Sequence, residues 1–249
     1  MISVRGVSKS FGQQRVLNNI SLELQEGQTT AIVGPSGVGK SVLLKLIMGI
    51  MQPECGEILV YGENITTARN ERAKNLIRER LGVLFQTAAL FDSLTVYGNV
   101  AFPLYERKGL SRARAHPYVV SMLESLSLTQ YASNYPEELS IGMRKRAGLA
   151  RALITEPKVL LFDEPNTGLD PLVGQDVYDL INLSRRRWGF TGIVISHELP
   201  EVFQVSDRVV MLLGGQVIED GTPDHFTHSK NAAVQQFLNG RTDGPIKIQ

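Results

Sequence analysis

The chain has 249 residues, of which 43% are hydrophobic and 20% charged, a globular composition that excludes disordered, collagen-like and disulfide-rich classes. Its formal net charge is 26 − 25 = +1, so no basic surplus favours a nucleic-acid partner. The single cysteine, Cys55, excludes an internal disulfide and fits a reducing compartment. No apolar run approaches the roughly 18 residues that span a bilayer, so we expect a cytosolic or peripheral protein.

The N-terminal quarter of the chain carries strand signals. Residues 1–5 predict a strand rather than a signal peptide. Residues 19–24 alternate apolar and polar side chains, which is typical of a half-buried antiparallel strand. Short strands are also predicted at 28–33 and 56–62. The first of these leads into a glycine-rich turn and a strongly apolar helix over 39–48.

Helical patterns then replace the strand signals. They run from about 91 to 156 and include a stretch at 112–126. Two uninterrupted apolar strands follow at 159–162 and 193–195, with a helical stretch between them, and such runs suit parallel strands covered on both faces. A final pair of strands joined by Gly214-Gly215 predicts a hairpin. The pattern predicts an α/β domain with a helical insertion.

A glycine-rich segment follows the strand at 28–33 and matches the phosphate-binding loop pattern of Gly, four residues, Gly-Lys-Ser/Thr. Glycines let the backbone turn its N–H groups toward phosphates, and the next helix points its positive end at the same anion. We expect Lys40 to contact the β- and γ-phosphates and the Ser41 hydroxyl to ligate Mg²⁺. The matching residues are Gly34, Pro35, Ser36, Gly37, Val38, Gly39, Lys40 and Ser41.

Acidic residues end the predicted strand at 159–162. Asp163 and Glu164 follow it directly, and acids at the carboxyl end of a buried parallel strand face the crevice where α/β sheets bind ligands. We expect Asp163 to hold Mg²⁺ through water and Glu164 to orient or deprotonate the attacking water. His197 ends the strand at 193–196 and is expected at the same edge, facing the γ-phosphate or the water. A solvated acid pair and a structural histidine are the alternatives.

The motifs, taken together and in order, resemble those of ATP-binding-cassette (ABC) ATPase subunits over nearly the whole chain. They are the phosphate loop at 34–41, Gln86, Leu139-Ser140-Ile141-Gly142, Asp163-Glu164, Gly168-Leu169-Asp170 and Ser196-His197. The resemblance implies an α/β fold: a P-loop NTPase core with a mixed, largely parallel sheet, an N-terminal antiparallel β subdomain and a helical subdomain at about 88–157. It also implies a single domain over 1–240, followed by a tail at 241–249.

The resemblance implies a homodimer that sandwiches two nucleotides. The phosphate loop of one copy and the Leu-Ser-x-Gly signature of the other then enclose each ATP, so Ser140 and Gly142 contact the partner's nucleotide, and Asp170 spans the interface. Gln86 is expected to ligate Mg²⁺ and to link the nucleotide to the helical subdomain. Phe11 falls where the family stacks an aromatic ring on adenine, a core phenylalanine being the alternative. The implied catalytic residues are Glu164, His197, Lys40 and Gln86.

The signature departs from the usual Leu-Ser-Gly-Gly-Gln of the family. Ile141 replaces the first glycine and Met143 the glutamine, whereas Ser140 and Gly142 are kept. A β-branched residue forbids the close backbone approach that glycine allows, so dimer closure is expected to be weaker. Ser140 is expected to cap a helix that runs to Leu153, with the basic run 144–146 on its exposed face.

Two stretches, 84–96 and 99–104, are similar to the ATPases of Mla-type phospholipid transporters, and so is the tail at 236–245. That resemblance implies an MlaE-like integral-membrane permease and a periplasmic MCE lipid-binding protein as partners. It also implies a peripheral position on the cytoplasmic face of a bacterial inner membrane, with a tail that can pack on the neighbouring subunit.

Other functions are open on the sequence. The first alternative is the ATPase of an importer for small solutes such as amino acids. A soluble ABC protein acting on ribosomes or DNA is disfavoured, because the chain has one phosphate loop and only 163 − 40 = 123 positions between Lys40 and Asp163, without sustained heptads. A module that binds ATP without turnover is disfavoured by Glu164 and His197.

Overall fold

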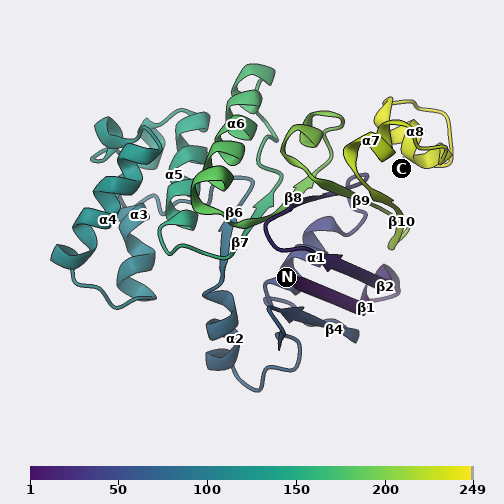
Figure 1. Ribbon diagram of the computed structural model, residues 1–249, viewed down its shortest axis with the longest axis horizontal. Helices are drawn as coiled ribbons and strands as arrows, with labels where there is room; N and C mark the ends of the chain where they lie inside the picture. Colours follow the sequence, from purple (N-terminus) through teal and green to yellow (C-terminus); the bar gives the residue numbers. More distant parts are fainter. Residues whose placement is uncertain (248–249) are drawn as a thin grey trace. The chain divides into compact units, whose positions relative to one another are not determined.

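A computed structural model of the protein describes residues 1–247 and divides the chain into two compact units (Figure 1). The first unit comprises Met1–Arg78 and Thr191–Gln249, and the second comprises Glu79–Phe190. The second unit thus begins and ends in the middle of the chain, as an insertion does. The helical subdomain expected at about 88–157 falls within it.

The first unit begins with an antiparallel sheet. Its strands are β1 (Ile2–Phe11), β2 (Gln14–Leu24), β4 (Cys55–Val60) and β5 (Glu63–Asn64), in the order β2-β1-β4-β5. Ile20, Leu22 and Leu24 of β2 are buried and the side chains between them are exposed, because successive residues of a strand face opposite sides. Ile2 pairs with Leu24. The antiparallel strand predicted at 19–24 is confirmed.

The first unit also holds strands that are mostly parallel. They are β3 (Thr29–Val33), β8 (Thr191–Ser196), β9 (Arg208–Leu213) and β10 (Gln216–Gly221), hydrogen-bonded in the order β10-β9-β3-β8. β3 is parallel to β8 and β9, and β10 returns antiparallel to β9. All residues of β3 and β8 are buried, as continuous apolar runs predict. The hairpin expected around Gly214-Gly215 is confirmed.

The helical segments of the first unit are α1 (Lys40–Ile47), α2 (Glu71–Arg78), η3 (Glu201–Val205), α7 (Pro223–Thr227) and α8 (Ala232–Leu238). α1 confirms the helix predicted over 39–48, and Leu43 and Leu44 are fully buried in it. The helix α2 was not predicted from the sequence: it spans only 8 residues, most of them charged or polar, and Ile77 is its one buried side chain.

The chain that follows α8 folds back onto that helix. Gln236, only 4% exposed, donates through Nε2 to the carbonyls of Arg241 and Ile246, and its Oε1 accepts from the Ile246 N–H. Gly244 lies against this amide so closely that a Cβ there would be 2.4 Å from Gln236 Oε1. The described part of the tail, up to residue 247, is therefore held by its own subunit, and 248–249 lie outside the described residues.

The second unit contains a parallel strand pair and a set of helices. Its elements are β6 (Leu81–Leu84), α3 (Val96–Glu106), α4 (Arg112–Ser125), η1 (Thr129–Tyr131), η2 (Pro136–Glu138), α5 (Ile141–Leu153), β7 (Val159–Asp163) and α6 (Pro171–Trp188). α4 confirms the helix predicted at 112–126, and β7 the strand predicted at 159–162. α3 contacts both α4 and α5. Gly189, with φ 66°, ends α6 in the left-handed conformation that favours glycine.

The architecture agrees with the fold class that the sequence predicts. The chain is α/β, with an N-terminal antiparallel sheet, parallel central strands and a helical region between β6 and β7. Within residues 1–247, no helix has both the length and the apolar character required to cross a membrane.

Candidate functional site

The predicted phosphate loop and His197 leave adjacent strands of the first unit at the same edge. Val33 and Ser196, the last residues of β3 and β8, are directly paired in a parallel ladder. Gly34 follows the first of them and His197 the second. The carboxyl ends of parallel strands are where α/β proteins bind ligands, so the register places both motifs at one ligand-binding edge.

The loop between β3 and α1 has the backbone that glycine permits. Gly34 has φ 142°, and a Cβ there would lie 2.3 Å from the Leu212 carbonyl oxygen, so any side chain would clash with β9. Gly37 has φ 78° and is exposed, and a Cβ added there would meet no atom within 4 Å. The first glycine is therefore required for packing, whereas the second leaves an open space at the loop that a Cβ would enter.

Lys40 is buried against this loop, with 4% exposure. Its Nζ donates to the Gly34 carbonyl at 2.7 Å and to the Pro35 carbonyl at 3.0 Å. Lys40 and Ser41 open α1, and Gly39 at the N-cap brings no side chain to the first turn. The N–H groups of a helix start and a nearby ammonium group together favour an anion.

Phe11 ends β1 and is 47% exposed, so it is not the core phenylalanine that the sequence left as an alternative. The Nζ of Lys9 lies 5.6 Å from the centroid of its ring. A half-exposed ring beside a cation can stack on a planar partner.

In the second unit, too, a pair of parallel strands brings predicted site residues to one edge, here Gln86, Asp163 and Glu164. Leu84 of β6 pairs with Phe162 of β7 in a parallel ladder, so Gln86 and the pair Asp163-Glu164 leave the same edge. Glu164 has φ 50°, a conformation that costs free energy for a residue with a side chain. Thr167, which the sequence pattern did not single out, donates from Oγ1 to Glu164 Oε2 at 3.0 Å and so helps to orient that carboxylate.

Lys145 corrects one expectation of the sequence. The basic run 144–146 was expected on the exposed face of the signature helix, but Lys145 is only 2% exposed. Its Nζ donates to the backbone carbonyl of Gln86, 59 residues earlier. A short run of basic residues in a sequence is typical of an exposed surface. The packing of α5 shows instead that the side chain of Lys145 is buried.

Ser140 caps α5, as the sequence predicts: its Oγ accepts from the Met143 N–H at 3.3 Å. Asp170 caps α6 in the same way and accepts from the N–H groups of Leu172 and Val173, both at 3.1 Å. Both caps lie at one pocket of about 380 Å³ between α5 and α6.

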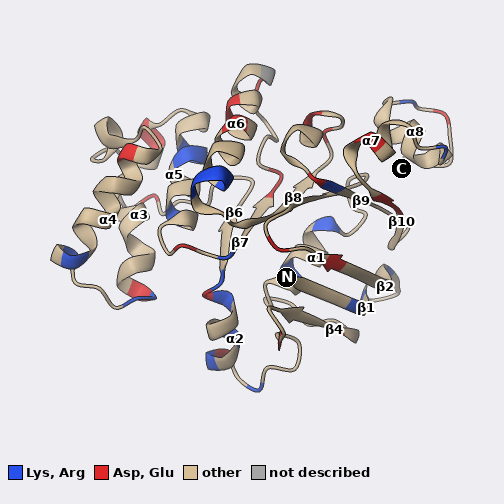
Figure 2. Cartoon of the chain, viewed as in Figure 1, with Lys and Arg blue, Asp and Glu red and all other residues tan. Residues whose placement is uncertain are grey.

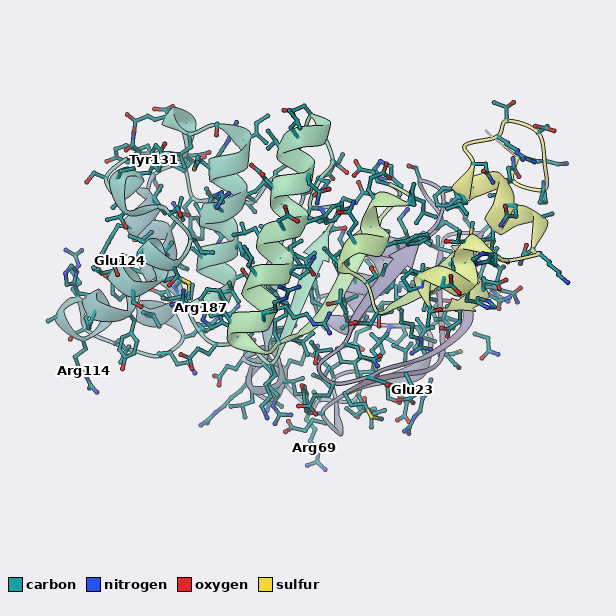
Figure 3. The ribbon with its side chains drawn as sticks, turned by 45° about the horizontal axis from the view of Figure 1, so that its top comes forward. Glu23, Arg69, Arg114, Glu124, Tyr131 and Arg187 are labelled. Carbon is teal, nitrogen blue, oxygen red and sulfur yellow. The ribbon has the colours of Figure 1, made fainter. Side chains whose placement is uncertain are left out.

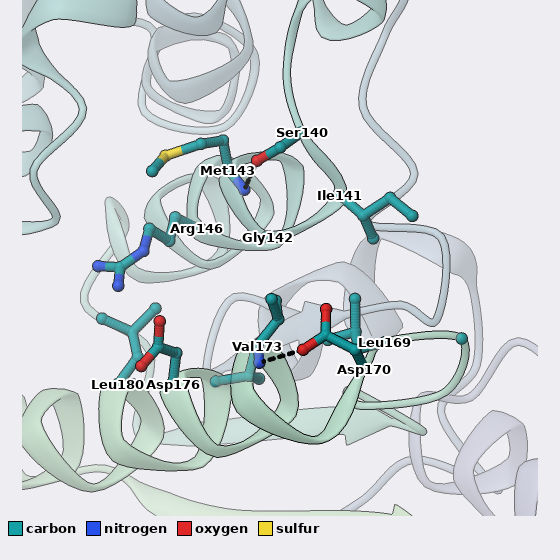
Figure 4. Close-up of a pocket in the computed structure, with 12 residues that line it drawn as sticks. Ser140, Ile141, Gly142, Met143, Arg146, Leu169, Asp170, Val173, Asp176 and Leu180 are labelled. Carbon is teal, nitrogen blue, oxygen red and sulfur yellow. Dashed lines mark hydrogen bonds between the residues drawn. The ribbon is translucent and has the colours of Figure 1, made fainter.

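Figure 4 shows this pocket with one hydrogen bond of each cap, Met143 N–H to Ser140 and Val173 N–H to Asp170. Gly142 also lines it, and a Cβ there would lie 3.1 Å from Val173 Cγ1, so a larger residue would press on α6. Arg146 of α5 and Asp176 of α6 lie on opposite walls. The signature and the Gly168-Leu169-Asp170 motif therefore border one cavity, although at least 168 − 142 = 26 positions separate them.

The predicted site residues are thus distributed over both units. The first unit brings together the phosphate loop and His197, and it carries Phe11 on a separate sheet. The second unit brings Gln86 close to Asp163-Glu164 at one strand edge, and Ser140, Gly142 and Asp170 around one pocket. Oxygen donors, a cation and helix N-termini are the groups that bind phosphates and a hard metal ion.

Comparisons with known proteins agree with this chemistry. Residues 17–167 match the family model described as ABC transporter. Over 249 residues, the chain is 38% identical to the Haemophilus influenzae protein named Intermembrane phospholipid transport system ATP-binding protein MlaF; the match covers 100% of this chain and 94% of that protein.

Two solved structures are similar along most of the chain. The first is cbiO1 from Clostridium perfringens, part of the ABC transporter complex cbiONQ, with a TM-score of 0.83 and 30% identity over 96% of this chain and 94% of that one. The second is the ATP-binding cassette MJ0796 in a dimeric post-hydrolysis state bound to ADP and Pi. Its TM-score is 0.79 and its identity 27%, over 90% of this chain and 99% of that one.

The family model covers more than half of the chain, and the Haemophilus influenzae protein matches all of it. The strand edges of both units carry the phosphate-binding and acidic motifs in the order that the ABC resemblance predicts. The chain belongs to the ABC transporter family and is an ATPase of that family.

Proposed function

We propose that this chain is the ATP-hydrolysing subunit of a transporter that moves phospholipids between membranes. The observation that carries the substrate class is the match, along the whole chain, to a Haemophilus influenzae protein whose name gives that transport. The similarity of residues 84–96 and 99–104 to Mla-type ATPases supports the same substrate. Moving a phospholipid out of a bilayer has a large free-energy cost, because its acyl chains would be exposed to water. ATP hydrolysis supplies this free energy.

The triphosphate of ATP fits the loop from Gly34 to Ser41. The backbone is open at Gly37, and Lys40 is already folded onto the loop, so its ammonium group needs little rearrangement to reach the β- and γ-phosphates. The start of α1 adds its N–H groups. Phe11 is exposed enough to stack on the adenine ring.

The side chains expected at the metal position have the ligand chemistry that Mg²⁺ requires. The Ser41 hydroxyl, the Gln86 side-chain oxygen and, through water, the Asp163 carboxylate are oxygen donors, which is the ligand type that Mg²⁺ prefers. When bound, the ion neutralises charge that develops on the phosphates. Glu164 orients or deprotonates the attacking water with Thr167 as its support, and His197 contacts the γ-phosphate or the water.

Two copies of the chain complete each site in this proposal. Ser140 and Gly142 present the N-terminus of α5 to the partner's γ-phosphate, and Asp170 lies at the same surface. The dimeric state of the similar MJ0796 supports this arrangement. The further partners are an MlaE-like permease, gripped by the helical subdomain, and a periplasmic MCE lipid-binding protein. Together they would hold the chain at the cytoplasmic face of the inner membrane.

The test is purification of the tagged full-length chain from native membranes, followed by reconstitution of the assembly in liposomes that contain a fluorescent phospholipid. We expect a permease and an MCE protein to co-purify, and lipid transfer to require ATP and Mg²⁺. Lys40→Ala is expected to abolish transfer, and Lys45→Ala, on the exposed side of the same helix, to retain it. A co-purifying solute permease with ATP-dependent amino acid uptake and no lipid transfer would replace the proposal by the importer alternative.

A further inference from the structure

One face of the signature helix α5 is turned toward the loop that carries Gln86. Lys145, Gly148 and Arg151 are spaced three residues apart, so they lie on neighbouring turns of one side of the helix. We call residues 85–91 the Gln86 loop. Basic residues recur along α5 in Figure 2, and those at 145 and 151 bind this loop.

Two cations of α5 bind backbone carbonyls of the Gln86 loop. Lys145 Nζ donates to the Gln86 carbonyl. Arg151 donates from Nη2 to Ala88 O at 2.8 Å and from Nη1 to Ala89 O at 2.7 Å. The guanidinium carbon of Arg151 also lies 5.7 Å from the Phe91 ring centroid. Burial lowers the pKa of Arg151, which agrees with a guanidinium group that has exchanged water for protein carbonyls.

Between the two cations, Gly148 allows the loop to approach the helix closely. A Cβ at Gly148 would lie 2.8 Å from Leu84 Cδ1 and 3.0 Å from Ala88 Cβ. A larger residue would push β6 and the loop away from α5, and both cations would lose their carbonyls. Close packing at Gly148, in addition to the hydrogen bonds of Lys145 and Arg151, therefore holds the Gln86 loop against α5.

Apart from the hydrogen bond from the Ala88 N–H to the Phe85 carbonyl at 2.8 Å, neighbouring elements supply the hydrogen bonds that support the shape of the Gln86 loop. Ala88 and Ala89 have φ 61° and 47°, and two successive alanines in the left-handed region are unfavourable unless neighbouring groups fix them. Arg151 binds the carbonyls of these same two residues. On the other side, the buried Asn99 of α3 accepts from the Phe91 N–H at 2.8 Å and donates to its carbonyl at 3.1 Å.

We propose that Lys145 and Arg151 are positioning residues that fix Gln86 to α5, so that Gln86 and the helix cap Ser140 move as one body. The inference rests on the proposed role of Gln86 at the nucleotide. In the dimer, Gln86 faces the nucleotide of its own subunit, whereas Ser140 faces that of the partner. A change at one nucleotide then moves a residue at the other through the Gln86 loop and α5.

The test measures ATP hydrolysis by the full-length chain, in the assembly in which it is purified, for Arg151→Gln, Arg151→Lys, Lys145→Met and Gln86→Ala. We expect Arg151→Gln to lower kcat about 10- to 100-fold, because a misplaced group costs that much, with the KM for ATP changed by less than about twofold. For Arg151→Gln, the Mg²⁺ concentration that gives the half-maximal rate should rise, and we expect the same rise in Gln86→Ala. Arg151→Lys, which keeps a donor, should recover part of kcat.

Arg114→Gln is the matched control, because Arg114 is exposed on α4 and extends away from the ribbon in Figure 3. The decisive variant combines Gln86→Ala with Arg151→Gln. If Arg151 acts through Gln86, the double variant is no slower than Gln86→Ala alone. Effects that multiply, or an Arg151→Gln protein with normal kcat and Mg²⁺ response, would overturn the inference while ATP-driven lipid transfer could still stand.

Thermal unfolding of each variant checks its fold. Lys145→Met leaves the Gln86 carbonyl without this donor, and if it unfolds at the assay temperature, the comparison of Arg151→Gln with Arg151→Lys carries the test. If Gln86→Ala hydrolyses ATP like the unchanged chain, Gln86 needs no positioning and the inference is wrong, whatever lipid or solute the transporter moves.

Discussion

Val33 and Ser196 are paired at the ends of parallel strands β3 and β8, so Gly34 and His197 begin side by side at one edge. The register of two buried strands therefore places the predicted phosphate-binding loop next to His197, the histidine expected at the γ-phosphate. Register is strongly specified there because both strands are buried throughout, and a slip would break the packing on both faces.

His197→Ala tests the role that this register suggests. We expect turnover to fall about 100-fold or more, as for a lost group that handles a proton or the γ-phosphate, while ATP binding is retained because the loop at Gly34 is unchanged. Phosphate release and equilibrium ATP binding are the measurements. His228→Ala, on an exposed side chain of the same unit, is the control. Normal turnover of His197→Ala would leave this residue a structural role only.

Three glycine variants separate phosphate binding from folding. Gly37→Ala places a Cβ in open space at the loop and adds left-handed strain, so we expect the affinity for ATP to fall and the melting temperature to drop only as much as in Gly27→Ala. Gly27→Ala carries the same left-handed strain, about 1–2 kcal/mol, at a turn with open space and should leave ATP affinity unchanged. Gly34→Ala should lower the melting temperature clearly, because its Cβ would meet Leu212 O at 2.3 Å. Equal ATP affinity in Gly37→Ala and Gly27→Ala would contradict the phosphate assignment.

Glu164→Gln keeps the size of the side chain and removes its basicity. We expect this variant to bind ATP, to accumulate as a closed dimer, and to lose at least about 100-fold in turnover. Size-exclusion chromatography with ATP and a phosphate-release assay measure the two effects. Thr167→Val removes the donor to Glu164 Oε2 and should cause a smaller loss. Glu124→Gln, an exposed glutamate of α4, is the control, and substantial turnover in Glu164→Gln would exclude Glu164 as the base.

Ser140→Asp tests the helix cap and its charge separately. Aspartate caps a helix about as well as serine, so α5 and the melting temperature should be preserved. Its negative charge would repel the γ-phosphate of the partner's nucleotide, so hydrolysis should be lost. Thr95→Asp makes the same exchange at the cap of α3, where Thr95 Oγ1 accepts from Gly98 N–H, and should leave hydrolysis intact. Normal activity of Ser140→Asp would remove the signature from the partner's site.

Several elements could be read from local sequence because one local interaction fixes each of them. The alternation at 19–24 predicts β2 because one face of that strand is buried. Ser140 predicts the start of α5 because its hydroxyl reaches the N–H three residues on. The helix α2 was not predicted in this way, since its apolar residues Ala73, Leu76 and Ile77 occupy about one turn of a short segment and only Ile77 is buried.

The phosphate loop and the acidic strand end could be predicted from the sequence because each depends on residues that are close along the chain, and the family could be predicted because several such local motifs follow one another in a fixed order. Two contacts became visible only in the folded chain: Lys145 is buried on the Gln86 carbonyl, and Thr167 donates to Glu164. A lysine in a basic run looks solvated until the helix that carries it is packed against a loop 59 residues away. Contacts of that kind are set by how α5 meets its neighbours, and no local pattern encodes them.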